Sequence, residues 1–311
     1  MSSTPTVFVC GATGSTGLNL VRQLRELNWT VHATVRDPSS PAAQTLASQG
    51  VSLTPGDWDN EAALAASIAG CTMLFLNTVI GFSDTSRERE QVASILSIAK
   101  AAGVRQVIYN SSLIIDRLEE LPTFDPDNIM GQSLLSKRAI EQLLKAAGFD
   151  FWTILRGASY MENFLGKKAA FMYGGLVKTG VWNFALRPDD KLPLIDTNDI
   201  AKFAVAAFQD PERFNKKDVE LSTDLMTPGE IMAVMSKATG REFKFVPMTE
   251  EEVEAKRAVD PMISAHLALR VLKDFVDVEE VKSWGIKLAT FEEFMAEPRN
   301  VEILMETYKG V

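Results

Sequence analysis

Three glycines near the amino terminus have the spacing of a phosphate-binding turn. Gly11, Gly14 and Gly17 recur every three residues, directly after a short apolar run and directly before an amphipathic one. Glycine tolerates the positive φ of a tight turn, lets a ligand approach the backbone, and lets a helix pack closely on a strand. Two hydroxyl side chains between the glycines, Ser15 and Thr16, add donors. This order of strand, turn and helix start predicts a site where helix amides bind the pyrophosphate of a dinucleotide.

Lys137 is the second residue whose type and position suit chemistry. It lies on a predicted helix, 132–147, near the margin of that helix's apolar face. The expected apolar face comprises Ala139, Ile140, Leu143, Leu144 and Ala147. A lysine at such a margin either binds a ligand or lays its aliphatic stem along the apolar face with its ammonium in water. The helix alone leaves both interpretations open.

Arg36 bears on the choice between two cofactors. It ends a predicted strand, 30–35, and follows Gly17 by nineteen residues, which is where a βαβ unit places a residue beside the adenine ribose. A carboxylate there suits the 2′-hydroxyl of NAD, whereas a guanidinium suits the 2′-phosphate of NADP. Asp37 follows directly, and Arg36 alternatively ends the strand as a surface residue. We interpret Arg36 as indicating NADP(H).

Strands and helices are expected to alternate through the first half of the chain. The expected strands are 7–10, 30–35, 51–54, 72–76, 105–110 and 149–155, and the helices between them include 42–48, 61–69, 85–102 and 132–147. Such alternation predicts a Rossmann-type, doubly wound parallel sheet. We assign this domain to residues 1–157 and a smaller, α-rich substrate or partner domain to residues 158–311, with a strand near 218–222 returning to the main sheet.

Ligands bind at the carboxyl edge of such a sheet. Asn77, Thr78 and Val79 follow the fourth expected strand at that edge, and Ser111 ends the fifth; we assign all four to cofactor binding. The acidic, proline-containing segment 113–130 leaves the same edge and has the length of a lid.

The turn after the third expected strand leaves two interpretations open. Asp57 accepts a hydrogen bond from the adenine amino group while Trp58 covers the ring, or else Asp59 or Asn60 caps the helix that follows. Further along, Asp199 is expected to cap a helix over 200–208. Some apolar residues of the second half are expected to line a substrate pocket, from the set Met161, Phe164, Phe171, Met172, Tyr173 and Trp182.

Composition excludes several classes of function. The 311 residues carry a net charge of −9 without a basic stripe, which argues against a nucleic-acid groove. No apolar stretch is long enough for a membrane span, and the first residues do not resemble a signal peptide, so we expect a cytoplasmic protein. The two cysteines lie in apolar runs and are expected to be buried thiols, and two histidines are too few for a histidine-rich metal site.

Several segments together resemble the NmrA-like family, a branch of atypical short-chain dehydrogenase/reductases close to the isoflavone-reductase-like enzymes. They are GATGSTG, TVRDP, GDWD, the pair Asn77-Thr78, Lys137 and LRGASYMENF. The resemblance covers most of the chain and is strongest up to Phe164. It implies that Lys137 contacts the nicotinamide ribose. It also implies cofactor contacts from Gly11, Thr13, Gly14, Ser15, Thr16, Gly17, Arg36, Asp57, Trp58, Asn77, Thr78, Val79, Tyr160, Met161 and Asn163.

One departure from the family pattern affects the expected chemistry. Ordinary short-chain reductases place a proton-donating tyrosine four residues before the lysine, whereas this chain has Ser133 there. A serine hydroxyl is too weak an acid for that role. The chemistry then requires Lys137 itself, Tyr160, or a substrate that needs no strong acid, and we take Lys137 and Tyr160 as the candidate catalytic residues.

Two functions follow from this pattern. The first is an NADP(H)-dependent reductase that transfers hydride to a small hydrophobic quinone, enone, imine or carbonyl compound in a cleft between the domains. The second is an NADP(H)-binding redox sensor that acts through a protein partner without turnover, since the NmrA-like family includes such sensors. The lysine favours the first function.

Overall fold

The chain forms two compact units. The computed structural model describes residues 4–78, 84–257, 260 and 263–311. Unit one comprises Met1–Ile115, Gln132–Arg156 and Ile200–Val219, and unit two comprises Asp116–Gly131, Gly157–Asp199 and Glu220–Val311. The chain passes between the units at several points, one of which is Arg156–Gly157. The predicted cofactor contact Val79 lies outside the described residues.

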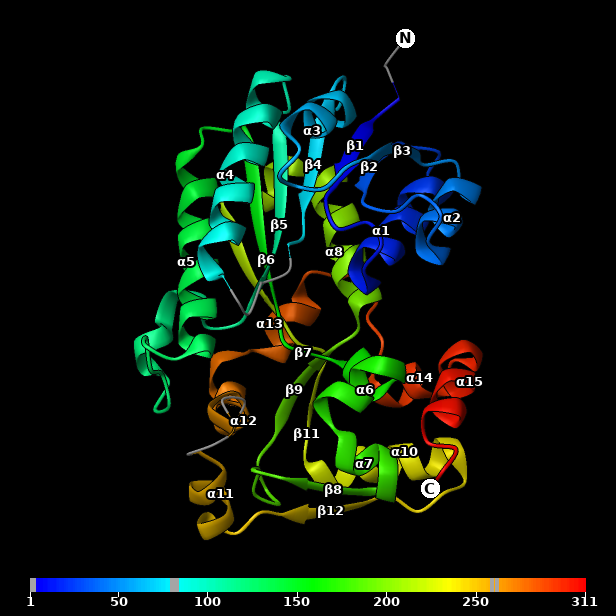
Figure 1. The fold of residues 1–311 in the computed structure, drawn as a ribbon, viewed down its shortest axis with the longest axis vertical. Coiled ribbons are helices and arrows are strands. Elements are labelled where there is room, and N and C mark those ends of the chain that lie inside the picture. Colours follow the sequence, from blue (N-terminus) through cyan, green and yellow to red (C-terminus); the bar gives the residue numbers. More distant parts are fainter. Residues whose placement is uncertain (1–3, 79–83, 258–259, 261–262) are drawn as a thin grey trace. The chain divides into compact units, whose positions relative to one another are not determined.

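Unit one is built on a seven-stranded sheet with the order β10-β6-β5-β4-β1-β2-β3 (Figure 1). The strands are β1 (Thr6–Val9), β2 (Thr30–Val35), β3 (Ser52–Pro55), β4 (Met73–Leu76), β5 (Gln106–Ser112), β6 (Phe151–Gly157) and β10 (Lys217–Leu221). β1 pairs in parallel with β2 and β4, β2 with β3, and β4 with β5. The order 3-2-1-4-5-6 is that of a Rossmann fold. It confirms the predicted fold class, and β10 is the predicted returning strand.

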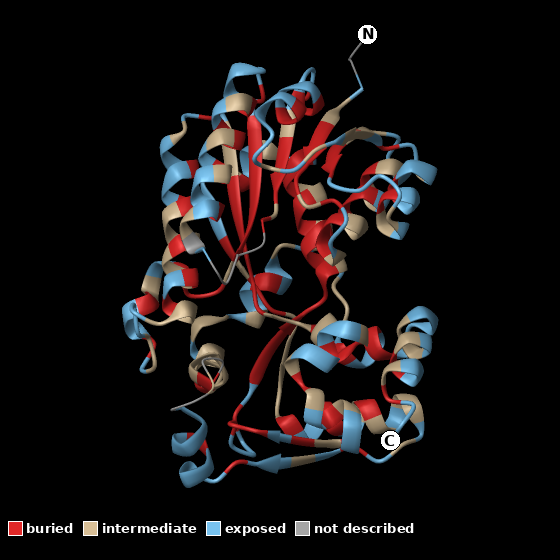
Figure 2. Ribbon diagram, viewed as in Figure 1, coloured by how far each residue is buried: buried red, intermediate tan, exposed pale blue. Residues whose placement is uncertain are grey.

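Helices cover this sheet. They are α1 (Ser15–Glu26), α2 (Pro41–Ser48), α3 (Glu61–Ile68), α4 (Thr85–Ala101), α5 (Ile129–Ala146), α8 (Thr197–Gln209) and α9 (Pro211–Phe214). Leu64 of α3, Ile95 of α4 and Ile140 of α5 share one core cluster with Phe8 of β1. Val7 points to the opposite face because strand residues alternate, and it is also fully buried. Burial on both faces explains why the sequences of the central strands β1 and β4 are almost continuously apolar (Figure 2).

Local capping decides where the helices begin. The Asn60 side chain accepts the Ala63 amide at 3.0 Å and caps α3. Asp59, by contrast, forms a salt bridge with Arg87, so Asn60 is the cap of the two residues considered. The Asp84 carboxylate caps α4 by accepting the Ser86 amide at 2.9 Å.

Unit two combines short strands with many helices. Its elements are β7 (Ser159–Tyr160), η2 (Met161–Phe164), α6 (Gly166–Met172), α7 (Gly174–Thr179), β8 (Val181–Phe184), β9 (Leu192–Ile195), β11 (Asp224–Met226), α10 (Pro228–Thr239), β12 (Lys244–Pro247), α11 (Glu250–Arg257), α12 (Ile263–Ala268), η3 (Leu272–Phe275), α13 (Val278–Ser283), α14 (Phe291–Ala296) and α15 (Pro298–Thr307). The strands form two small sheets, β11-β9-β7 and β12-β8. Thr227 and Glu230 form a capping box at the start of α10.

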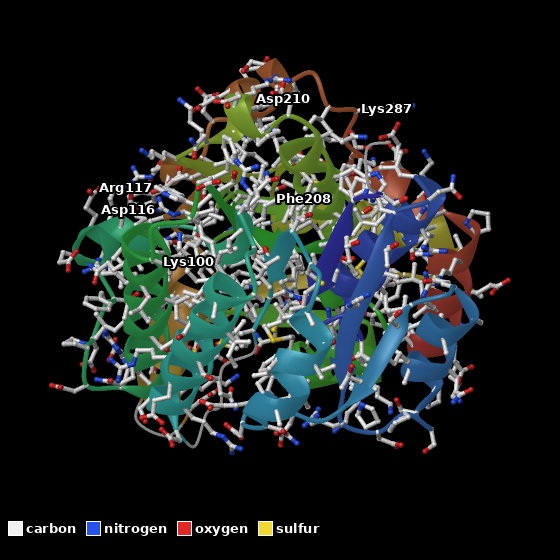
Figure 3. The ribbon with its side chains drawn as sticks, turned by 90° about the horizontal axis from the view of Figure 1, so that it is seen from above. Lys100, Asp116, Arg117, Phe208, Asp210 and Lys287 are labelled. Carbon is white, nitrogen blue, oxygen red and sulfur yellow. The ribbon has the colours of Figure 1, made fainter. Side chains whose placement is uncertain are left out.

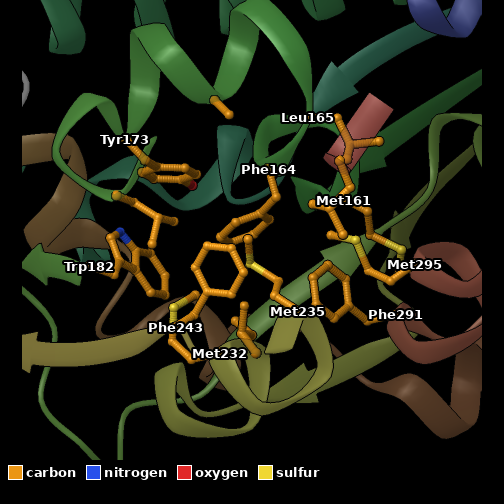
Figure 4. Packing of buried hydrophobic residues seen from close by; sticks show 14 of the residues in the cluster. Met161, Phe164, Leu165, Tyr173, Trp182, Met232, Met235, Phe243, Phe291 and Met295 are labelled. Carbon is orange, nitrogen blue, oxygen red and sulfur yellow. The ribbon is translucent and has the colours of Figure 1, made fainter. Parts of the chain in front are cut away.

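An aromatic core fills unit two (Figure 4). The Phe164 ring lies 4.9 Å from Tyr173 and 5.5 Å from Trp182, measured between ring centroids. These residues and Met161 are buried in the core of unit two. That some residues of the predicted set line a substrate pocket stays a prediction. Phe171, from the same set, is 71% exposed on α6. The apolar pattern of this segment therefore reflects core packing.

The segment predicted as an irregular lid contains a 3-10 helix, η1 (Ile115–Glu120). Its Leu118 side chain is fully buried. Arg117 lies 2.8 Å from the Glu220 carboxylate and 3.8 Å from Asp116, whose position Figure 3 shows. Buried apolar side chains and ion pairs thus hold part of this segment, which its polar composition did not indicate.

The described residues include no helix long and apolar enough to cross a bilayer, and no group of three or more metal-ligating side chains. Cys10 and Cys71 are buried thiols, as predicted. Burial raises the pKa of both to about 12, which makes them poor nucleophiles.

Candidate functional site

The glycine turn joins β1 to α1. Gly11 has a φ of +74°, and a Cβ atom there would overlap the main-chain oxygen of Asn77. A Cβ atom on Gly17 would overlap the main-chain oxygen of Gly11 and lie 2.7 Å from the Ala12 Cα atom. Gly14, in extended conformation, is the N-cap of α1 and provides no side-chain cap. The helix start is therefore shaped for an acceptor from outside the chain, as a dinucleotide phosphate would be.

The end of β4 lies beside this turn. The Cys10 amide donates to the Phe75 oxygen at 2.9 Å, and the Asn110 side-chain amide donates to the Asn77 side-chain oxygen at 3.0 Å. β1 and β4 are the strands between which the order of the sheet reverses. Ligands of open α/β sheets bind in the crevice at this reversal, outside the carboxyl ends of the strands.

Lys137 and Glu88 form a buried ion pair near the same edge. The Lys137 ammonium lies 3.7 Å from the Glu88 carboxylate, and their side chains are 12% and 1% exposed. Glu88 also accepts the Thr78 hydroxyl at 2.7 Å and the Ser136 hydroxyl at 3.3 Å. Burial lowers the pKa of Lys137, and the Glu88 carboxylate opposes part of that decrease. The ammonium also lies 5.8 Å from the centre of the Tyr109 ring.

The position of Lys137 corrects the predicted face of α5. Leu143, assigned to the apolar face, is 38% exposed. The face that is buried carries Ser133, Ser136, Ile140, Glu141 and Leu144. Lys137 falls within this face, so it is not the surface lysine that the helix alone allowed. Polar residues with internal partners occupy positions that hydrophobicity alone assigns to solvent.

Ser111 belongs to a second buried network. Its hydroxyl donates to Glu141 at 2.7 Å, and Glu141 also accepts two hydrogen bonds from Arg156, at 2.7 and 3.1 Å. Arg156 donates further to Asp218 at 2.9 Å. The donor hydrogens of both Ser111 and Thr78 are thus directed at buried carboxylates. Any cofactor contact from these two residues has to use their main chain or the remaining lone pairs of the hydroxyl.

Arg36 and the turn after β3 lie at the same edge of unit one. Arg36 is exposed and forms no salt bridge within the described part of the chain. Asp37 accepts the Ser39 amide at 2.8 Å and its hydroxyl at 2.6 Å, and these bonds lower the pKa of its carboxyl group. Asp57 is exposed and accepts the Asp59 amide at 3.1 Å, while Trp58 packs partly against the core. The Arg36 guanidinium is thus available at the end of β2, and of the Asp37 carboxylate one oxygen, Oδ1, is occupied by Ser39.

The remaining predicted residues belong to unit two. Tyr160 pairs with Ile195 across β7 and β9, and the Lys168 ammonium lies 6.0 Å from its ring centre. Met161 is fully buried in the core of unit two, so only its main chain is available to a ligand. Asn163 is half-buried on η2. The catalytic role of Tyr160 stays a prediction.

Sequence reasoning missed Glu88. Its signal lies in the helical period, because Glu88, Val92, Ile95 and Ala99 are buried on one face of α4. An acidic residue in phase with apolar positions indicates a buried, partnered carboxylate.

A carboxyl pair in unit two was also missed. Glu162 accepts the Thr197 amide at 3.2 Å, and burial raises the pKa of Glu162. Burial, together with the Glu162 charge, raises the pKa of Asp196 to about 8. Asp196 also accepts the Asn198 amide at 2.8 Å at the start of α8, whereas Asp199, the predicted cap, accepts the Ala289 amide at 2.7 Å. The assignment of the cap to Asp199 is therefore wrong.

The fold defines the class of the protein, a Rossmann-type α/β protein with a glycine turn at its first crossover. The chain belongs to the NmrA-like family, whose sequence profile matches residues 3–295.

Relatives of this chain include proteins named as oxidoreductases. It is 26% identical over 256 residues to the NmrA-like family domain-containing oxidoreductase malD of Malbranchea aurantiaca, which covers 77% of this chain and 74% of that protein. It is 26% identical to an NAD(P)H azoreductase of Xenophilus azovorans, covering 82% and 81% of the two chains. It is 25% identical to quinone oxidoreductase 2 of Escherichia coli, covering 80% of each.

Solved structures share the fold. The NADPH complex of quinone oxidoreductase 2 from Escherichia coli matches with a TM-score of 0.72 at 23% identity, covering 94% of this chain and all of that one. The NADP complex of NmrA, a negative transcriptional regulator, matches with a TM-score of 0.74 at 21% identity, covering 97% and 98%. NmrA has also been solved with NAD.

Proposed function

We propose that this protein is an NADP(H)-dependent reductase that transfers hydride to a small hydrophobic acceptor. The observation that carries the proposal is the buried Lys137–Glu88 pair, which Thr78 joins to the end of β4 beside the glycine turn. A buried ammonium is costly, because the desolvation of its charge has to be offset. Its position at a ligand-binding edge therefore makes it a candidate functional group. Relatives named as a quinone oxidoreductase and an azoreductase support the reaction class.

The residues of the turn fit a nicotinamide dinucleotide. The uncapped start of α1 and the glycines, whose Cβ atoms would fill the turn, suit its pyrophosphate. Arg36 suits a 2′-phosphate, because its guanidinium is exposed and free of carboxylate partners among the described residues. When bound, the cofactor supplies the hydride.

The chain itself supplies positioning and charge. Lys137 contributes a positive charge that orders the ribose and stabilises negative charge developing on the acceptor. Ser133 replaces the usual tyrosine and is 3% exposed. An acceptor that tolerates hydride without a strong acid, such as a quinone, enone, imine or azo compound, fits this arrangement better than an isolated ketone.

The first test measures turnover. Purified protein is assayed for NADPH oxidation with a panel of quinones, enones, imines and azo compounds. We expect turnover with at least one class of acceptor. We expect its loss in Lys137→Met, a neutral replacement of similar length, with NADPH affinity little changed, and its retention in Lys178→Ala, which removes an exposed lysine. Tight NADPH binding without turnover on any panel member would contradict the reductase.

The second test measures cofactor preference. Arg36→Ala is expected to weaken NADPH binding by about ten- to a hundredfold, the worth of one or two charge-assisted hydrogen bonds, and to leave NADH binding unchanged. Arg89→Ala, at another exposed arginine of unit one, is the matched control and is expected to change neither affinity. Calorimetry of the two variants, each with NADPH and with NADH, measures these affinities. An equal loss of affinity for both cofactors in Arg36→Ala would assign Arg36 another role.

A redox-sensing regulator is the second candidate function. Two observations favour it: the tyrosine position is occupied by Ser133, and the chain shares its fold with NmrA, described as a negative transcriptional regulator solved with NAD and with NADP. A sensor would respond to the cellular ratio of NADPH to NADP⁺ through a difference in its affinities for the two forms. The turnover panel distinguishes the two candidates directly.

A further inference from the structure

Glu88 is a buried carboxylate that the reductase proposal does not yet use. It lies on α4, with its side chain 1% exposed. It receives donors from three directions: the Thr78 hydroxyl after β4 at 2.7 Å, the Ser136 hydroxyl of α5 at 3.3 Å, and the Lys137 ammonium at 3.7 Å. A buried charge with three partners is held in one place, because each partner offsets part of its desolvation.

We propose that Glu88 is the positioning residue of the candidate site, which holds the Lys137 ammonium protonated and fixed next to the end of β4. The effect of Glu88 on turnover rests on the proposed reductase function. The ion pair itself is a property of the folded chain and does not depend on that function. It gives α4 a direct part in the site, although the sequence indicated only that α4 covers the sheet.

The groups around Lys137 make Glu88 the decisive partner. Glu141, on the same helix, is the other carboxylate close enough to act on Lys137, but it is engaged by Ser111 and Arg156. Tyr109 of β5 faces the ammonium with its ring, and burial keeps the pKa of its hydroxyl well above the ordinary value, so it remains neutral. Loss of the Glu88 charge therefore leaves burial as the dominant influence on Lys137.

Removal of the Glu88 charge has a predictable effect on the protonation of Lys137. Burial disfavours the ammonium form, and Glu88 favours it. Glu88→Gln keeps the shape of the side chain and an oxygen for Thr78, but removes the charge. Lys137 is then expected to lose its proton at a lower pH, by about one unit or more, as for an opposite charge within a few ångströms. The positive charge at the site then disappears within the range in which the wild-type protein retains it.

The experiment is an NMR titration of the free protein labelled with ¹³C at the lysine ε position. The Lys137 signal is identified by its absence in Lys137→Ala. We expect its midpoint to fall in Glu88→Gln, to fall less in Glu88→Asp, which keeps the charge, and to stay unchanged in Glu90→Gln, which removes an exposed carboxylate from the same helix. An unchanged midpoint in Glu88→Gln, or an equal shift in Glu90→Gln, would overturn the proposal. If Glu88→Gln does not fold, the Lys137 midpoint in Glu88→Asp is compared with that in Glu90→Gln. A fall in Glu88→Asp alone supports the proposal, and no fall in either variant overturns it.

Turnover gives the second readout. If the protein is a reductase, the alkaline limb of its kcat profile is expected to move to lower pH in Glu88→Gln by the shift seen in the titration, with kcat at lower pH retained. A shifted titration with an unshifted kcat profile would remove Glu88 from the reaction. A shifted titration in a protein without any turnover would leave the positioning of Lys137 intact and contradict the reductase instead, so the two proposals fail separately.

Discussion

At the scale of single residues, unit one pairs each of its buried charges. Lys137 has Glu88, and Arg156 has Glu141 and Asp218. The removal of one partner from such a pair costs about 3–5 kcal/mol, because the other charge is left buried and uncompensated. Ala or Leu at these positions would therefore act mainly through a loss of stability. Neutral replacements of similar size are the informative ones, Gln for Glu88 or Glu141 and Met for Lys137.

Gly17→Ala is a prediction at the same scale. The new methyl group would overlap the Gly11 oxygen and crowd the Ala12 Cα atom, so α1 would have to move away from β1. We expect a stability loss of about 1–3 kcal/mol, typical of overpacking, and weaker NADPH binding because the first-turn amides move. Thermal denaturation and calorimetry measure the two effects.

The control is Gly229→Ala on α10, where a Cβ atom meets nothing within 4 Å. It is expected to leave NADPH binding unchanged and to stabilise slightly, because alanine favours a helix more than glycine does. If Gly17→Ala bound NADPH as the wild type does, the close approach of α1 to the turn would not matter for the cofactor.

At the scale of elements, each candidate residue of unit one takes its place from a strand end or a helix cap. β1, β2, β3, β4 and β5 are parallel neighbours, so the residues that follow them meet at one edge. The cap of α3 helps to fix the turn that carries Asp57 and Trp58, since Asn60 lies two residues after Trp58 and its side chain accepts the Ala63 amide.

Asn60→Ala tests this capping. The variant loses the hydrogen bond to the Ala63 amide, and we expect the free energy of unfolding of the cofactor-binding unit to fall by about 1 kcal/mol. Thr45→Ala, at an exposed position of α2, is the control and is expected to cost nothing, because alanine is the better helix former. Urea denaturation measures both. If Asn60→Ala left the free energy of unfolding unchanged, as Thr45→Ala is expected to do, the α3 cap would contribute no stability.

The elements were more predictable than the contacts of the site. Local patterns predicted the strands of unit one to within a few residues, because continuous apolar runs and glycine stops are local signals. The predicted face of α5 included Ile140 and Leu144 correctly, but it included exposed Leu143 and left out Ser133, Ser136 and Glu141. These polar residues and Glu88 were missed because the burial of a polar residue depends on a partner from another element. Thr78 and Lys137 are 59 positions apart in the sequence yet share one carboxylate. No local pattern contains that information.

At the scale of the whole molecule, stability has to depend on pH through buried acids that are far from the glycine turn in sequence. Burial and the Glu162 charge raise the pKa of Asp196 to about 8, above its ordinary value of 3.8. The folded chain therefore binds this proton more tightly than the unfolded chain. Between about pH 4 and about pH 8 the folded state holds more of the Asp196 proton than the unfolded state does, so the contribution of Asp196 to the free energy of unfolding falls as pH rises through this interval. Burial lowers the pKa of His266 to about 4, so this histidine contributes in the opposite direction below about pH 6.5.

Asp196→Asn removes this dependence while keeping an acceptor for the Asn198 amide. We expect the variant to lose less stability than the wild type between about pH 5 and about pH 8, and to gain most over it at the upper end. Asp189→Asn, at an exposed aspartate of unit two, is expected to leave the wild-type slope unchanged. Thermal denaturation across this range measures all three slopes, and a wild-type slope retained in Asp196→Asn would show that Asp196 ionises at its ordinary pKa.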